Sequence, residues 1–158
     1  MSLTIISPSF SNNGIIPLRH TCDGLDISPA LKWTGVPEAA RSLVLIVEDP
    51  DAPDPIAPKT RWVHWILYNL PTASSGIPEG VSTGDMSSIA RHGLNDWRRL
   101  GYSGPCPPIG VHRYFFQLYA LDVMLPDLHH PFRAALQSAM QNHVIDCADL
   151  VGRYQRQY

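Results

Sequence analysis

Four segments of this 158-residue chain contain residues that could do chemistry, and the first contains two carboxylates close to prolines. The string DPDAP at residues 49–53 places Asp49 and Asp51 two residues apart at the end of an apolar run. Side chains at this spacing on a strand can point to the same side, and the prolines stiffen the backbone that holds them. Taken alone, an Asp/Pro string is more often a solubilising turn.

The second segment is a histidine inside the apolar string WVHW at residues 62–65. Such a histidine must be hydrogen-bonded or face a cavity. For His64 taken alone, a satisfied core residue is the more common case.

The third and fourth segments are HRY at residues 112–114 and GYSGPCPP at residues 101–108. In a strand, His112 and Tyr114 share one face while Arg113 points away, and His and Tyr can donate hydrogen bonds to an oxyanion. The alternative is a polar pair at a strand end without a ligand. The glycines and prolines of the other string let main-chain N–H groups approach an anion, although alone it is only a loop.

The elements that must position these segments are predicted to be mostly strands. Apolar runs rich in aromatic and β-branched residues favour strand over helix, and one amphipathic helix is expected from Pro131, with Phe132, Ala135, Leu136, Ala139 and Met140 at helical spacing. We therefore predict a mainly β fold, a sandwich of two antiparallel sheets with a C-terminal helix and long loops, in one domain over residues 1–158. The strands are expected at residues 3–10, 31–34, 42–48, 62–70, 111–122 and 144–154.

The composition excludes several classes of protein. Only 16% of the residues are charged, and the 12 Lys and Arg residues are scattered, so nucleic acid is not an expected partner. Fifteen prolines predict ordered loops between the elements. The longest unbroken apolar run is too short to span a bilayer, and integral membrane association is not expected.

The three cysteines, Cys22, Cys106 and Cys147, are widely separated and odd in number. Without a CxxC pair, neither a zinc site nor a disulfide framework is indicated. No charge-led apolar leader is recognisable at the N-terminus, so the expected location is cytoplasmic.

Taken together and in order, the four segments resemble the phosphatidylethanolamine-binding protein family. The resemblance extends over nearly the whole chain and includes DISP at residues 26–29 and DLVGRY at residues 149–154. The strings GPCPP at residues 104–108 and YALD at residues 119–122 look like the bacterial, Raf kinase inhibitor protein-like members.

The resemblance implies a β-sandwich with a small anion-accepting pocket near one end. It implies a non-enzymatic protein that binds a small anion, such as phosphate or a phosphorylated head group, and that could regulate an unknown protein partner. It implies no cofactor, no metal and no catalytic residue. By the match to the family motif, the pocket would be lined by Asp49, Asp51, Pro53, His64, Gly104, Cys106, His112 and Tyr114, with Trp62 and Tyr102 at its rim.

Two departures from the family pattern affect this expectation. Cys106 stands where many eukaryotic members have glycine, which would put a thiol at the edge of the pocket. No counterpart of the C-terminal helix that covers the pocket in animal members follows Tyr154. A more open pocket is therefore expected, and small-anion binding is better supported than lipid binding.

An anion next to two carboxylates should be repelled. We therefore expect Asp49 and Asp51 to hydrogen-bond to His64 and His112 and to favour protonated rings that donate to the anion. On this mechanism, affinity for an anion of constant charge falls as pH rises through the histidine pKa values.

The alternative function is a hydrolase or lyase in which His64 and His112 act as acid and base and Cys106 is the one conceivable nucleophile. A metal site built from Asp49, Asp51 and the two histidines is a third possibility. Two structural expectations complete the prediction: a cis Ala52–Pro53 bond, and a homodimer.

Overall fold

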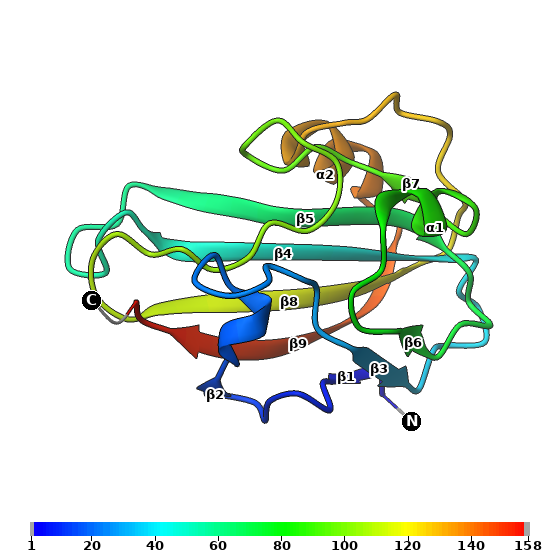
Figure 1. Cartoon of the computed structure of the whole chain (residues 1–158). Coiled ribbons are helices and arrows are strands. Elements are labelled where there is room, and N and C mark those ends of the chain that lie inside the picture. The colour runs from blue at the N-terminus through cyan, green and yellow to red at the C-terminus, as the bar shows by residue number, and fades with distance from the viewer. Residues whose placement is uncertain (1, 157–158) are drawn as a thin grey trace.

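The computed structural model describes residues 2–156 and contains two β-sheets packed face to face (Figure 1). The smaller sheet has the order β1 (Thr4–Ile6), β3 (Leu31–Thr34), β6 (Gly76–Ile77). The larger sheet has the order β2 (Gly14–Ile15), β9 (Val144–Tyr154), β8 (His112–Leu121), β4 (Ser42–Ala52), β5 (Thr60–Leu70), β7 (Arg91–His92). Neighbouring strands are antiparallel except for the short parallel pair β2–β9. The predicted mainly β sandwich is confirmed.

The continuous apolar run of β4 is explained by burial of both of its faces. Leu43, Leu45 and Val47 pack into the core between the two sheets. The alternate residues Val44 and Ile46 belong to a second core on the outer face of the larger sheet. The same alternation directs Asp49, which follows Val47 by two residues, towards the inner side of the sandwich.

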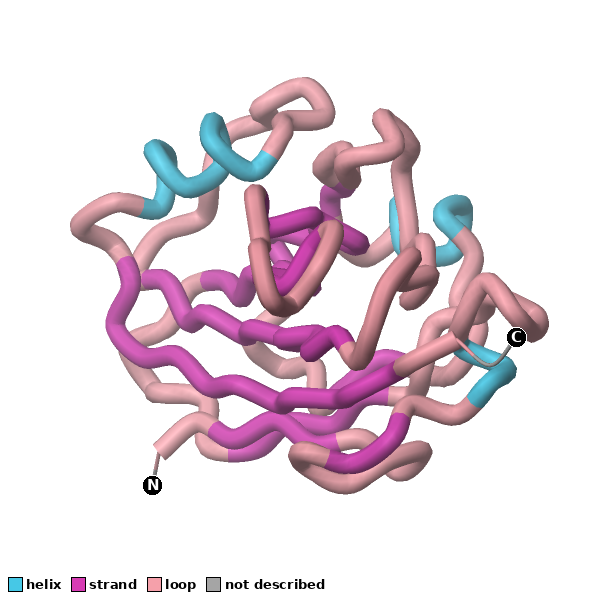
Figure 2. The backbone as a smooth tube through the Cα atoms, turned by 90° about the vertical axis from the view of Figure 1, so that its left-hand side faces the viewer, coloured by secondary structure: helices cyan, strands magenta, loops and turns pink. Residues whose placement is uncertain are grey.

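Three short helices are connected to this frame. The predicted C-terminal helix is α2 (Arg133–Met140), which begins two residues after Pro131 and buries Leu136 and Met140 against the outer core. Two further helices were not predicted: α1 (Thr83–Ser87), which Ser82 caps, and the 3-10 helix η1 (Leu18–His20). Figure 2 shows that loops make up much of the backbone, as the proline content predicts. No helix within residues 2–156 is both long enough and apolar enough to cross a membrane.

A disulfide bond joins Cys22 to Cys106, across a sequence separation of 84 residues. The expectations that no disulfide is indicated and that Cys106 is a thiol at the edge of the pocket are therefore wrong. Their spacing carries no signal of the bond, because only the fold brings the loop after η1 next to the loop before β8. Backbone contact reinforces this link, since the Cys22 N–H donates to the Pro105 carbonyl at 3.1 Å.

Removal of the disulfide should destabilise the protein. For the double variant Cys22→Ala/Cys106→Ala, we expect the free energy of unfolding to fall by about 2–5 kcal/mol, because the unfolded chain loses a cross-link. Urea denaturation under non-reducing conditions measures this difference. Cys147→Ala is the matched control, because Cys147 is exposed and unpaired in the structure. Equal stability of the double variant and the wild type would contradict the assignment.

Candidate functional site

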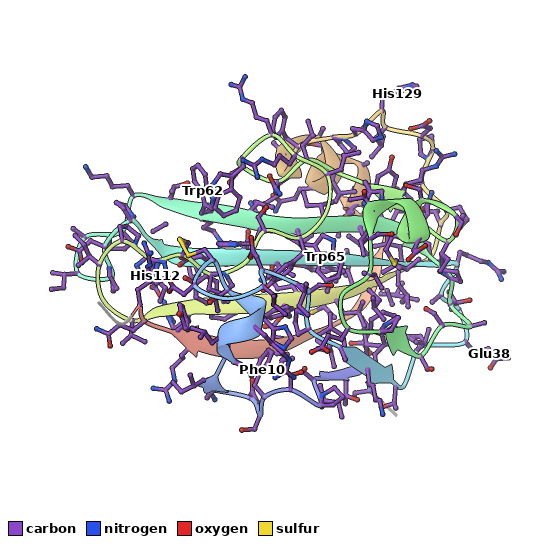
Figure 3. All side chains as sticks on the ribbon, viewed as in Figure 1. Phe10, Glu38, Trp62, Trp65, His112 and His129 are labelled. Carbon is purple, nitrogen blue, oxygen red and sulfur yellow. A yellow bond between two sulfur atoms is a disulfide. The ribbon has the colours of Figure 1, made fainter. Side chains whose placement is uncertain are left out.

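A cavity of about 340 Å³ opens at the end of the sandwich where β4 ends and β8 begins. In Figure 3, Trp62 and His112 lie towards this end, and Glu38 lies at the other. The Ala52–Pro53 peptide bond at its edge is cis, as predicted. The cavity is lined by Asp49, Ala52, Pro53, Thr60, Trp62, His64, Trp97, Cys106, Pro107, Pro108, His112 and Tyr114.

A buried pair of Asp49 and His112 forms one side of the cavity. The Nδ1 atom of His112 lies 2.5 Å from Oδ2 of Asp49, and Nε2 lies 2.9 Å from the carbonyl oxygen of Ile109. Each of these two contacts needs a proton, so the pair as a whole carries no net charge. Burial raises the pKa of the Asp49 carboxyl, and the hydrogen bond from His112 opposes that rise. Neither ring nitrogen of His112 is left to bind a ligand.

Asp51 does not reach the cavity, which corrects the expectation that both aspartates point into it. Its carboxylate receives the backbone N–H, Nε and Nη2 of Arg113 at 2.8–3.0 Å. The hydrogen bond from the guanidinium holds the pKa of Asp51 below its usual value. The cause is an irregularity in the β4–β5 pairing between Asp49 and Ala52, which breaks the alternation on which the prediction depended.

His64 is held by a reciprocal pair of hydrogen bonds to Ser103. Its Nδ1–H donates to the Ser103 carbonyl at 2.6 Å, and the Ser103 N–H donates to the His64 carbonyl at 3.1 Å. Burial lowers the pKa of His64 to about 4. The ring is therefore neutral at pH 7, and its Nε2 atom, which then carries no proton, can only accept a hydrogen bond. The expected protonated, anion-donating histidine is not what the structure provides.

Tyr114 supplies a hydrogen-bond donor that the protein does not use. Its side chain is 1% exposed, and its hydroxyl has no hydrogen-bond partner among the described residues. Its ring lies edge-on to His64 and stacks with His112 at a centroid distance of 6.4 Å. Burial raises the pKa of the phenol, so the hydroxyl keeps its proton.

Two tryptophans also line the cavity. Trp62 and Trp97 meet edge to face at 5.5 Å, and Trp97 also contacts the His64 ring at 4.9 Å. The prediction missed Trp97, which lies in a loop between β7 and β8. Asn95 fixes this loop, because its Oδ1 accepts the N–H groups of Trp97 and Arg99. A tryptophan directly after the turn-forming pair Asn95-Asp96 is the one signal that could have indicated it.

Two other residues, Tyr102 predicted at the rim and Gly104 predicted in the lining, are not among the residues that line the cavity, because both are directed to the His20 carbonyl. The Tyr102 hydroxyl donates to the His20 carbonyl at 2.7 Å. Gly104 approaches the same carbonyl so closely that a Cβ would lie 2.1 Å from its oxygen. Except for Asp51, the remaining predicted residues line the cavity: Asp49, Pro53, Trp62, His64, Cys106, His112 and Tyr114. Ala52, Thr60, Trp97, Pro107 and Pro108 are cavity residues that the prediction did not include.

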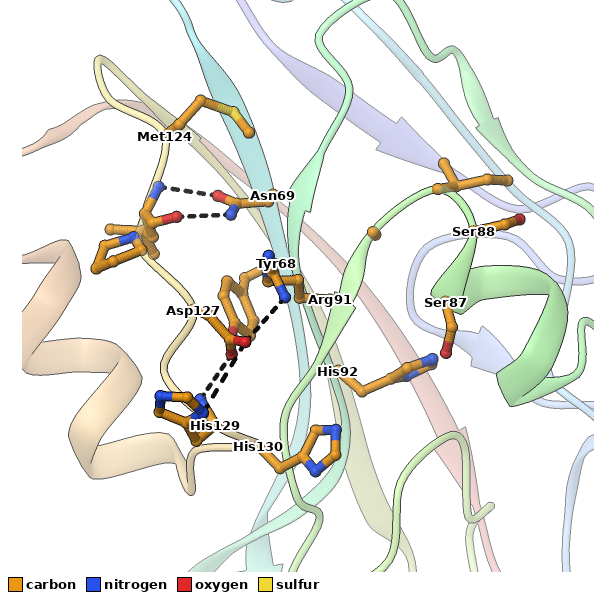
Figure 4. Close-up of a pocket in the computed structure, with 14 residues that line it drawn as sticks. Tyr68, Asn69, Ser87, Ser88, Arg91, His92, Met124, Asp127, His129 and His130 are labelled. Atoms are coloured by element: carbon orange, nitrogen blue, oxygen red, sulfur yellow. Dashed lines mark hydrogen bonds and ion pairs between the residues drawn. The ribbon is translucent and has the colours of Figure 1, made fainter.

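A larger cavity, of about 700 Å³, lies beside β7 and the loop before α2 (Figure 4). Asp127 and Arg91 form an ion pair there at 3.2 Å, and the side chains of both are about half exposed. His129 is 87% exposed. Exposed charges of this kind are screened by solvent, so this cavity is a weaker candidate. The described residues contain no cluster of three or more His, Cys, Asp or Glu side chains suited to a metal ion. The metal site considered from the sequence is not formed, because Asp51 faces away from Asp49, His64 and His112.

Comparison with known proteins agrees with this architecture. The family model described as phosphatidylethanolamine-binding protein matches residues 6–155. A UPF0098 protein of Methanothermobacter thermautotrophicus is 47% identical over 149 residues, which cover 94% of this chain and 95% of that protein. A crystal structure of a putative phosphatidylethanolamine-binding protein homolog from Chlamydia trachomatis superposes with a TM-score of 0.89 at 42% identity, covering 99% of both chains. E. coli YbcL gives 0.87 at 26% identity, covering 99% of this chain and all of that one.

The depressed pKa of His64 predicts a specific loss of stability in acid. Because the unfolded chain binds a proton near pH 6.5 and the folded chain only near pH 4, stability is retained above pH 6.5 and falls as pH drops. The loss due to His64 should be about 1.4 kcal/mol per pH unit, roughly 3 kcal/mol in all. Urea denaturation of wild type and His64→Gln between pH 4 and 7.5 measures it. The variant should show the shallower slope, and parallel slopes would refute the buried neutral ring.

Proposed function

The chain belongs to the phosphatidylethanolamine-binding protein family, and we propose that its cavity binds a small ligand through an oxyanionic group such as phosphate or a phosphorylated head group. Membership identifies a ligand-binding protein in general terms. The name of the family suggests the phosphorylated group. What the chain's own residues contribute to such binding is argued from the cavity.

The unused hydroxyl of Tyr114 is the observation that carries the proposal. A buried polar group without a partner costs about 1–3 kcal/mol of stability, so an orphaned donor in a cavity wall is suited to a ligand acceptor. An oxyanion is a stronger acceptor than a neutral group. The ring of Tyr114 lies 5.2 Å from the neutral His64 ring, measured between centroids. The Tyr114 hydroxyl would donate to a phosphate oxygen, and His64 Nε2 would accept a hydrogen bond only from a group of the ligand that carries a proton.

The carboxylates nearby do not oppose an anion in this proposal. The charge of Asp51 is compensated by Arg113 on the other side of β8. Asp49 is hydrogen-bonded to His112, and this pair carries no net charge. The repulsion that the sequence suggested is therefore largely cancelled within the protein. Charged histidines are not needed to cancel it, and the expected fall in affinity through the histidine pKa values gives way to a flat profile for an anion of constant charge.

The hydrolase or lyase alternative has less support. Cys106, the conceivable nucleophile, is bonded to Cys22. Both nitrogens of His112 are occupied by protein acceptors, so that ring is not available as a general acid or base. His64 remains as a single acceptor without a nucleophile to activate.

The proposal predicts that Tyr114→Phe separates binding from stability. Calorimetric titration with dimethyl phosphate at pH 7 should show affinity reduced about tenfold or more, because a hydrogen bond to a charged group contributes about 1.5–3 kcal/mol. The free energy of unfolding should stay the same or rise, because the variant removes an unpaired buried hydroxyl.

Tyr102→Phe is the matched control. It removes a buried phenol hydroxyl that is already bonded to a backbone carbonyl, so it should lower stability and leave the affinity for dimethyl phosphate within about twofold. Equal affinities of the wild type and Tyr114→Phe would refute the assigned donor. No binding of dimethyl phosphate to the wild type would refute the function.

A further inference from the structure

The ionisable groups that line the cavity are paired or neutral within the protein itself. Asp49 and His112 form a pair without net charge, and His64 is neutral above the acid range. Cys106 is half of a disulfide and cannot become a thiolate. The described residues that line the cavity include neither lysine nor arginine.

Two arginines next in sequence to lining residues are bound to carboxylates elsewhere, and Arg98, which follows Trp97, is not among the residues that line the cavity. Arg113 is bound to Asp51 and points away from Tyr114, which follows it in β8. Arg61, between Thr60 and Trp62, makes a 2.7 Å ion pair with Glu48 on the outer face of the larger sheet. Neither guanidinium can reach an anion in the cavity without breaking an ion pair.

An electroneutral cavity treats singly and doubly charged ligands very differently. In a Born description, the cost of removing an ion from water grows with the square of its charge. The attraction to neutral donors such as the Tyr114 hydroxyl grows only in proportion to the charge. Without a cation in the wall, the second charge on a ligand therefore raises the cost more than it raises the attraction.

We propose that the cavity selects singly ionised phosphate groups over doubly ionised ones. This inference rests on the proposed function and adds the charge class of its ligand: a phosphodiester, or a phosphomonoester that keeps one proton. Its second consequence is that the pH dependence of binding follows the ionisation of the ligand. Of the protein groups that face the site, Asp49 and both ring nitrogens of His112 are held in hydrogen bonds within the protein, the His64 ring is neutral, and Tyr114 keeps its proton.

The test compares two ligands of similar size by calorimetric titration between pH 5 and 9. Dimethyl phosphate keeps one negative charge throughout, and its affinity should be constant. Methyl phosphate loses its second proton near pH 6, so its affinity should match that of dimethyl phosphate near pH 5. Above pH 6 it should fall about tenfold per pH unit, since only the singly charged form binds.

A variant with an added cation makes the test independent of the wild-type profile. Thr60 lines the cavity but is exposed, so Thr60→Arg can place a guanidinium at its edge without a core change. This variant should recover methyl phosphate binding at pH 8 by about tenfold or more, and Thr60→Gln should keep the wild-type pH profile.

The outcomes separate the two proposals. Constant or rising affinity of the wild type for methyl phosphate from pH 5 to 9 would overturn the charge selectivity and leave the proposed function standing. An unchanged methyl phosphate profile in Thr60→Arg would also overturn it. Failure of both ligands to bind at any pH would overturn the proposed function, and the selectivity with it.

Discussion

The contact between Asp49 and His112 determines the geometry and the charge of the whole site. Regular pairing of β4 with β8 ends at Glu48 opposite Phe115, and this side-chain contact extends the connection beyond the last backbone pair. The other nitrogen of His112 holds the Ile109 carbonyl, which fixes the loop that brings Pro107 and Pro108 to the cavity. Breaking a buried pair of this kind typically costs about 3–5 kcal/mol. One interaction thus links two strands, a loop and the neutrality of the pocket.

The carboxylate of Glu48, the residue before Asp49, is buried in a different way. Glu48 points to the outer face of the same sheet, is fully buried, and pairs with Arg61 at 2.7 Å and with Arg133 at 2.8 Å. Two guanidiniums compensate one carboxylate there and, through Arg133, tie the start of α2 to the sheet. Because consecutive residues of a strand face opposite sides, these arginines are directed away from the cavity. On the outer face of the sheet the buried carboxylate of Glu48 is paired with two arginines, and on the inner face that of Asp49 is paired with His112.

Sequence periodicity predicted the elements well where the pattern is local. The strands at Leu31–Thr34 and Val144–Tyr154 agree with the prediction residue for residue, because alternation and flanking turns are visible in the sequence. Three features depend on contacts between distant segments and were not predictable from that pattern. They are the irregularity that turns Asp51 towards Arg113, the disulfide across 84 residues and the position of Trp97 against Trp62.

The charge state of the site shows a different limit of sequence analysis, since most of the predicted residues are in place. His64 was correctly placed at the cavity, yet residue type alone suggests a cation near pH 6.5. Burial converts it into a neutral ring. This ring donates from Nδ1 to the Ser103 carbonyl and can accept a hydrogen bond at its other nitrogen. With Tyr114 as a donor beside it, the proposed binding of a phosphate depends on directed hydrogen bonds. The packing around the His64 ring therefore determines whether His64 would contact a ligand as a cation or as a neutral hydrogen-bonding group.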